Sequence, residues 1–119
     1  MALMMSRKKS AGALALLTAS HTTSASATYT LTDDYAKVYV NVADGLIGGE
    51  TVSQYATVTC SNSRTVTEVA HDGVSKNNDG VGHGCTIATY VIDNCRAGDV
   101  ITIGARTSGY ATLAYIIMG

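Results

Sequence analysis

The residues with the widest chemical repertoire in this sequence are three cysteines, Cys60, Cys85 and Cys95. An odd number leaves at least one thiol without a disulfide partner in a single chain, and spacing alone does not choose among the three possible pairings. If the protein is exported, one disulfide is expected; if it is assembled inside the cell, the thiols are expected to stay reduced and partly buried. The three cysteines are therefore candidate disulfide residues whose pairing is open.

Histidines close to these cysteines raise the question of zinc, but their spacing does not support it. The available ligands would be His71, His83, Cys85 and Cys95. One residue separates His83 from Cys85, and nine residues separate Cys85 from Cys95. Structural zinc sites usually bring their ligands in closely spaced pairs such as CxxC or HxxxH. We therefore expect no metal ion and no other cofactor.

Hydrolytic chemistry has equally little support. His71 and Asp72 are neighbours and Ser75 follows them, but the members of a catalytic triad must meet in space rather than in sequence. Asp33 and Asp34 form an adjacent acidic pair at a predicted turn, where carboxylates are ordinarily solvated. No nucleophile is paired with a base, so we predict no catalytic residues and a protein that is not an enzyme.

The composition limits the partners of the chain. Of its 119 residues, 14% are charged and the formal net charge is −1, so no basic surface for nucleic acid is expected. The hydrophobic residues, 46% of the total, are mostly small and aliphatic, and there are seven Tyr but no Trp, Phe or Pro. The length fits one domain, and a core without large aromatic side chains buries little area per residue. A disulfide, oligomerisation or both would supplement such a core.

Hydrophobic and polar residues alternate from Thr28 to the C-terminus, which is the period of strands rather than helices. Turns rich in Gly, Asn and Asp separate the runs, including one at Asp44–Gly45 and a long polar loop over 71–84. We predict an all-β antiparallel sandwich or jelly roll of six or seven strands, with the last two strands inside their sheets. The expected strands cover 28–32, 36–42, 52–60, 64–70, 85–92, 99–106 and 110–118.

Residues 1–27 differ from residues 28–119, which are expected to form the β-sandwich domain. A basic cluster, a short apolar run over 11–19 and an A-x-A site ending at Ala27 match the layout of a secretory signal peptide. The apolar run is too short to cross a bilayer as a helix, so no membrane span is expected. The alternation between Ala13 and Thr18 equally suits a first strand followed by a loop over 18–28. Both interpretations stay open at this point.

The final strand carries apolar residues on both faces, whereas a sandwich sheet buries only one face in its own core. The other face needs a partner. A neighbouring subunit is the simplest one, and the apolar N-terminal segment is its rival. We therefore expect a homo-oligomer, with a trimer as the favoured form. The candidate interface residues are Tyr110, Leu113, Tyr115, Ile116, Ile117 and Met118.

Residues 95–119, CRAGDVITIGARTSGYATLAYIIMG, contain a strand, a short polar turn and a final apolar strand. This pattern resembles the last two strands of jelly-roll domains, both the trimeric TNF/C1q-like heads and the small β-domains of bacteriophage fibre and decoration proteins. Residues 29–42, YTLTDDYAKVYVNV, resemble the opening strands of the phage-type domains, in which a similar run leads into a strand of alternating Val.

The resemblance implies a structural component of a phage or prophage virion, either a head decoration protein or a tail or fibre protein. Such a protein would form a homotrimer, bind other capsid or tail proteins or a host surface, and catalyse no reaction. The alternative is a small secreted bacterial binding or inhibitor protein with one disulfide. The N-terminal residue of the mature protein distinguishes these two functions.

Overall fold

The computed structural model describes residues 14–47, 55–76, 83–106 and 112–119, and these residues form eight strands and no helix. Each pair of neighbouring strands is antiparallel, so the predicted all-β antiparallel fold is confirmed. The strands are β1 (Leu16–Thr22), β2 (Ser26–Thr30), β3 (Tyr35–Ile47), β4 (Thr57–Cys60), β5 (Val66–Lys76), β6 (His83–Cys95), β7 (Val100–Gly104) and β8 (Thr112–Met118).

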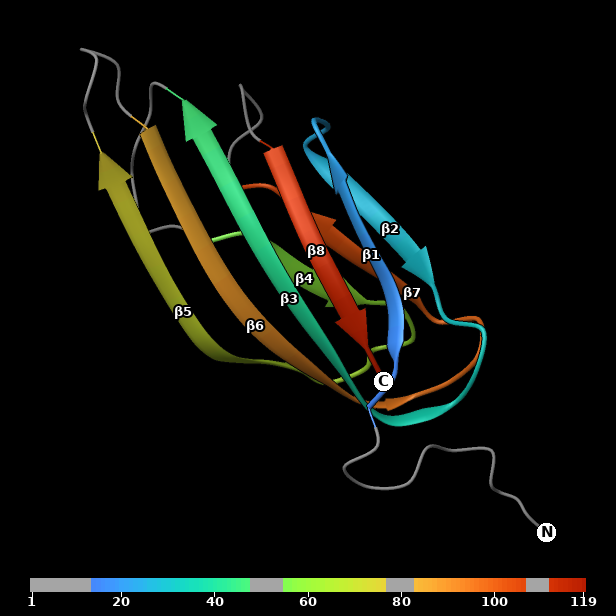
Figure 1. The fold of residues 1–119 in the computed structure, drawn as a ribbon. Helices are drawn as coiled ribbons and strands as arrows, with labels where there is room; N and C mark the ends of the chain where they lie inside the picture. Colours follow the sequence, from blue (N-terminus) through green and yellow to red (C-terminus); the bar gives the residue numbers. More distant parts are fainter. Residues whose placement is uncertain (1–13, 48–54, 77–82, 107–111) are drawn as a thin grey trace, which may run out of the picture.

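The strands form two sheets that pack face to face as a sandwich (Figure 1). The five-stranded sheet has the order β1-β8-β3-β6-β5, and the three-stranded sheet has the order β2-β7-β4. The pairs β1–β8, β2–β7 and β3–β6 are those of a jelly roll, in which a long folded ribbon wraps around the core. Strands β7 and β8 each lie between two neighbours, which confirms that the last two strands are internal.

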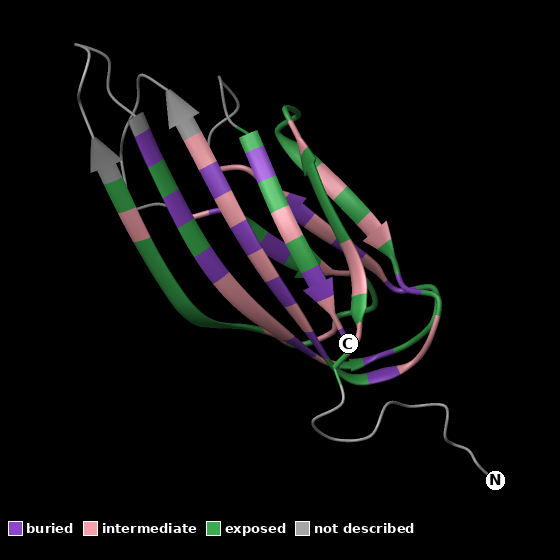
Figure 2. Ribbon diagram, in the orientation of Figure 1, coloured by how far each residue is buried: buried purple, intermediate pink, exposed green. Residues whose placement is uncertain are grey.

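Alternation along the strands explains which side chains form the core. Val38, Val40 and Val42 of β3 face the second sheet and are at most 2% exposed, while Asn41 between them faces outward. The purple bands of Figure 2 show the same alternation along β3, β6 and β8. The other core residues are Leu31, Tyr35, Ala56, Val58, Ala88, Ile92, Cys95, Ile101, Ile103, Leu113 and Ile117.

Two predicted loops are wrong in part, because strand pairing continues through residues that favour turns. The predicted turn at Asp44–Gly45 does not form, since both residues pair with β6 on one side and β8 on the other. Strand β5 runs on to Lys76 and β6 starts at His83, so much of the predicted loop over 71–84 is strand. The predicted strand residues 52–54 and 110–111 lie outside the described part of the chain.

The N-terminal segment supplies an edge strand of the larger sheet. Strand β1 pairs along β8, and Ala15 exchanges two backbone hydrogen bonds of 2.8 and 3.0 Å with Gly119. A first strand is present, but it covers Leu16–Thr22 rather than the alternating residues from Ala13 to Thr18, and β2 follows after residues 23–25 and not after a loop over 18–28. Cleavage after Ala27 would remove β1 and divide β2, and this cleavage stays a prediction.

Candidate functional site

The outer face of the five-stranded sheet carries an open trough with a volume of about 560 Å³. Strands β1, β8, β3 and β6 all contribute to it, and we call it the outer trough. Its side chains point away from the second sheet, because they alternate with the core residues of the same strands. The principal lining residues are Ala19, Asn41, Ala43, Ile87, Ala114 and Ile116.

Small and large side chains together give the outer trough its shape. Ala43 and Ala114 lie directly opposite each other on β3 and β8. Because both side chains are small, the outer surface is recessed at the middle of the sheet. Ile87 on β6 and Ile116 on β8 rise beside them and are 54% and 43% exposed. The apolar residues on both faces of the final strand led to the prediction that its second face needs a partner. The trough itself depends on which small residues are adjacent across strands, which the sequence does not reveal.

The lining of the outer trough offers no acid–base pair. Thr89 donates a hydrogen bond of 2.8 Å to the Asn41 side-chain oxygen, so these two polar groups satisfy each other. Among the described lining residues there is no Asp, Glu, Lys, Arg or Cys, and the titratable ones are His21 and Tyr115. Exposed and mostly apolar surfaces of this kind are typical of interaction sites.

A smaller hollow of about 120 Å³ continues the outer trough towards β5, beyond Ile87. His71 and Asp72 line it, but they do not pair, because neighbours on a strand face opposite sides of the sheet. The His71 ring stacks on Tyr55 with ring centroids 4.3 Å apart, and its Nδ1 contacts the Glu68 carboxylate. The arrangement gives no triad from His71 and Asp72, and the side chain of the third candidate, Ser75, lies outside the described structure.

The structure divides the predicted interface residues of the final strand. Leu113 and Ile117 are 0% exposed and belong to the core between the sheets, so they are not available to a partner. Tyr115 is half-buried and packs against that core, although it also borders the trough. Ile116 and Met118 lie on the outer face. The remaining candidate, Tyr110, lies outside the described residues.

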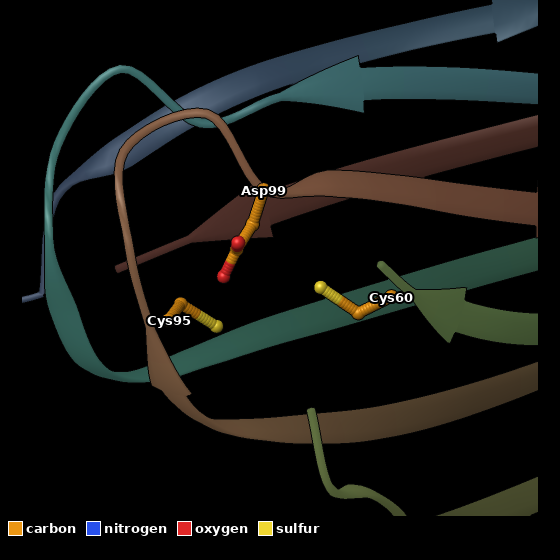
Figure 3. A group of neighbouring side chains, drawn as sticks. All are labelled: Cys60, Cys95 and Asp99. Atoms are coloured by element: carbon orange, nitrogen blue, oxygen red, sulfur yellow. The ribbon is translucent and has the colours of Figure 1, made fainter. Parts of the chain in front are cut away.

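A second cluster lies between the sheets, at the end where β4 and β6 finish. The sulfurs of Cys60 and Cys95 and a carboxylate oxygen of Asp99 lie within 4.8 Å of one another (Figure 3). Cys85 is exposed on β6, and nine residues of strand separate it from Cys95; these ten steps span about 33 Å at roughly 3.3 Å per residue. Cys85 and Cys95, which were considered as zinc ligands, are therefore far apart, and the side chain of His83 lies outside the described residues.

Asp99 is 1% exposed and accepts four hydrogen bonds. Arg64 donates from Nε to Oδ2 (2.7 Å) and from Nη2 to Oδ1 (3.2 Å). The Asn62 side chain and the Arg96 backbone N–H donate the other two, at 2.7 and 2.9 Å. The Arg64 guanidinium, followed by the Arg96 and Asn62 donors, lowers the pKa of Asp99 to about 2 despite its burial. Sequence reasoning missed this site, because a Gly-Asp pair before a strand is common.

The adjacent acids Asp33 and Asp34 stabilise a nearby turn rather than standing free in solvent. The Asp33 carboxylate accepts a hydrogen bond of 3.0 Å from the backbone N–H of Asp34. The Asp34 carboxylate accepts one of 2.9 Å from the backbone N–H of Ala97 and one of 3.3 Å from the Arg96 side chain. These contacts tie the segment before β3 to the turn between β6 and β7.

At the opposite end of β3, another aspartate is buried with fewer partners. Asp44 is 0% exposed and accepts one hydrogen bond of 2.7 Å, from the backbone N–H of Arg106. Its other oxygen, the Thr86 hydroxyl and the three side-chain nitrogens of Arg106 have no hydrogen-bond partner among the described residues. Asp44 and Thr86 are directly opposite each other on β3 and β6, so these groups gather at one end of the sandwich.

No protein family matches the chain, and no curated protein or solved structure is significantly similar to it. In the described ranges, no helix is long and apolar enough to cross a membrane.

Proposed function

We propose that this protein is a non-enzymatic structural component that associates with copies of itself through the outer trough. The observation that carries the proposal is the exposed, uncharged face over the centre of the five-stranded sheet, with Ile87 and Ile116 standing beside it. The outer face of a sandwich sheet is not part of the core between the sheets, and exposed apolar patches of this kind mark interaction surfaces.

A second copy of the chain is the occupant that the size and chemistry of this face favour. A section of the five strands about seven residues long, with strands about 4.8 Å apart, covers roughly 550 Å² of flat area. A standard interface buries about 800 Å² of accessible surface per partner, and the relief of the side chains brings the accessible area of this face closer to that value. The lining has no net charge to select an oppositely charged partner. In a closed trimer the contacts run head to tail, so the trough of one subunit would meet a different part of the surface of the next.

The wider role that we propose is assembly in a phage or prophage virion, as a head decoration, tail or fibre protein. The support for this role is the resemblance of residues 29–42 and 95–119 to phage-type jelly-roll strands, together with a trough lining that has no acid–base pair. A trimer is the proposed form, with other capsid or tail proteins or a host surface as further partners. Mass spectrometry of purified particles from the source strain tests the location directly.

The oligomer is tested by mass photometry and light scattering of the full chain over a concentration series. We expect a species of three chains, about 37 kDa from three times 12.3 kDa, that dissociates on dilution. Ile116→Lys and Ile87→Lys place a charge in the trough and should weaken association at least tenfold. Val69→Lys is the matched control, because Val69 is 55% exposed on β5 and does not line the trough.

Two outcomes would overturn the assembly proposal. One is a monomer at every concentration up to about 100 μM, with circular dichroism showing a folded β protein. The other is association that Ile116→Lys leaves unchanged while Val69→Lys abolishes it, which would move the interface to the β5 edge.

One observation favours the second candidate, a small secreted binding or inhibitor protein with one disulfide. The thiols of Cys60 and Cys95 lie close enough to suggest such a bond. The N-terminal residue of the protein from its natural source separates the two functions: a chain starting at Thr28 supports secretion, and a chain starting at or near Met1 supports virion assembly.

A further inference from the structure

Cys60 and Cys95 come from different sheets and meet between them. Cys60 is the last residue of β4 in the three-stranded sheet, and Cys95 is the last residue of β6 in the five-stranded sheet. Their side chains point towards each other across the gap (Figure 3). Their sulfurs lie within 4.8 Å, so side-chain rotation has to close the remaining distance to the 2.05 Å of a disulfide.

The surroundings of the pair exclude Cys85 as a competitor. Cys95 is 2% exposed and Cys60 is half-buried, whereas Cys85 is exposed far along β6. A strand is rigid over this length, so Cys85 cannot reach either sulfur while the sheet is intact. Of the three pairings that the sequence leaves open, the geometry permits one.

A metal ion is a weaker explanation for the same cluster, because Asp99 is already occupied. Its two carboxylate oxygens accept four hydrogen bonds, two of them from the Arg64 guanidinium. A cation would have to displace this buried ion pair to gain its third ligand, and it would then lie close to the positive charge of Arg64. Two thiols with no free third ligand suit a covalent bond better than coordination.

We propose that Cys60 and Cys95 form an intersheet disulfide in an oxidising environment, and that Cys85 is the remaining free thiol. The inference does not rest on the proposed assembly, since the pair lies in the interior of one chain. The bond would tie the end of β4 to the end of β6 and close a loop that contains the whole β5–β6 hairpin.

The reaction is an exchange with a small disulfide such as oxidised glutathione. The Cys60 thiolate attacks one sulfur of the oxidant, forming a mixed disulfide and releasing one glutathione thiolate. The Cys95 thiol then loses its proton and attacks the Cys60 sulfur, which releases the second glutathione thiolate. Two protein thiols lose two electrons and two protons in total, and the oxidant is reduced to two thiols.

Formation of the bond in the folded protein should be slow. Burial, followed by the electrostatic interactions with the Cys60 thiol group and the Asp99 carboxylate, raises the pKa of Cys95 to about 12, so its thiolate is scarce near neutral pH. Burial and Asp99 also raise the pKa of Cys60. We therefore expect the disulfide to form faster while the chain folds than after it has folded.

The test is to refold the full chain with oxidised and reduced glutathione and to compare it with chain refolded in a reductant. Intact mass, peptide mapping and thiol titration in denaturant identify the bond. Cys85→Ser is the matched control, because it removes the exposed thiol and leaves the pair. Cys60→Ser and Cys95→Ser each remove one partner.

The expected result is that wild type and Cys85→Ser each lose the mass of two hydrogens and yield a peptide joining Cys60 to Cys95. Closing a loop of this length should raise Tm by about 10 °C, reversibly on reduction. The Cys60→Ser and Cys95→Ser chains should show neither change. Wild type should keep one titratable thiol, and Cys85→Ser none.

Three results would overturn the inference. The first is a Cys85→Ser chain that keeps two titratable thiols after oxidative refolding. The second is a wild-type disulfide that maps to Cys85. The third is stoichiometric uptake of added zinc by the reduced wild-type chain, with protection of both thiols that is lost in Cys95→Ser. Peptide mapping of the oxidised wild-type chain identifies the disulfide-bonded cysteines even if one Ser variant does not fold.

Discussion

Asp99 and Asp44 are both buried in this sandwich, yet the two ends of the molecule hold them differently. Asp99 accepts four hydrogen bonds, two of them from a guanidinium, whereas Asp44 accepts one from a backbone N–H. The Thr86 hydroxyl opposite Asp44 finds no partner in the described part of the chain. The two carboxylates are therefore equally buried but unequally stabilised. The number and charge of their hydrogen-bond donors decide how much each aspartate contributes to the free energy of unfolding.

The largest expected effect comes from neutralising the better-held aspartate. Asp99→Asn removes the charge that Arg64 pairs with and puts an amide N–H₂ against existing donors, so we expect the free energy of unfolding to fall by about 3 kcal/mol. This is the low end for a broken buried ion pair, because the Arg64 side chain is 25% exposed and can turn to water. Urea unfolding at pH 7 measures it.

Asp44→Asn is the matched control for that substitution. Its amide oxygen can still accept the bond from the backbone N–H of Arg106, so the free energy of unfolding should change by less than about 1 kcal/mol. Equal losses in the two variants would mean that burial, and not donor number, sets the contribution of these aspartates.

The acid stability of the protein should depend on the Asp99 carboxylate. The folded-state pKa of Asp99 is lowered from 3.8 to about 2, so its contribution is fully present above pH 4 and is lost as the pH falls through 2. The unfolded chain then binds the proton more readily than the folded chain. We expect about 1–2 kcal/mol of stability to disappear over this interval, after allowance for the solvent around Arg64.

Comparing wild type with Asp99→Asn isolates this effect from the other carboxylates. The difference in unfolding free energy between the two chains should shrink as the pH is lowered from 5 to 2. A difference that stays constant would show that folding does not change the pKa of Asp99, and a difference that grows would show that folding raises it.

The sequence predicted the sandwich well, because strand periodicity is local. Alternating Val in β3 and apolar residues on both faces of β6 and β8 were enough to assign internal strands. The Asp99 cluster could not be predicted, since Arg64 and Asp99 are 35 residues apart and meet only after the sheets have packed. The turn predicted at Asp44–Gly45 was wrong for the complementary reason. The turn preference of these two residues is local, whereas their pairing with β6 and β8 comes from the sheet and overrides it.

A smaller effect, of opposite sign, is expected at the Asp44 end. The Thr86 hydroxyl is 1% exposed and has no partner in the described ranges, so Thr86→Val replaces an unsatisfied polar group with a methyl of similar size. We expect a gain of about 1 kcal/mol in unfolding free energy. Thr89→Val is the control, because its hydroxyl donates to Asn41 and its removal should lose about 0.5–1 kcal/mol. Destabilisation by Thr86→Val would indicate that its hydroxyl is satisfied in solution, by a buried water for example.

The smallest effect is expected at an ion pair whose geometry matches that of Asp99 but whose surroundings do not. Lys37 Nζ lies 2.7 Å from Asp93 Oδ1, the same distance that separates Arg64 Nε from Asp99 Oδ2. The Lys37 and Asp93 side chains are 56% and 33% exposed, so water competes for both charges and salt screens them. Lys37→Met should therefore leave the urea midpoint unchanged within error at physiological salt and lower it slightly at low salt.

The hydrogen bond from Lys37 to Asp93 raises the pKa of Lys37 above its ordinary value. Any contribution of this ion pair to stability is therefore present at neutral pH and disappears only as the pH rises through the folded-state pKa of Lys37. If Lys37→Met destabilised the fold as much as Asp99→Asn, distance alone would set the strength of these pairs, and the contrast drawn from burial and donor number would fail.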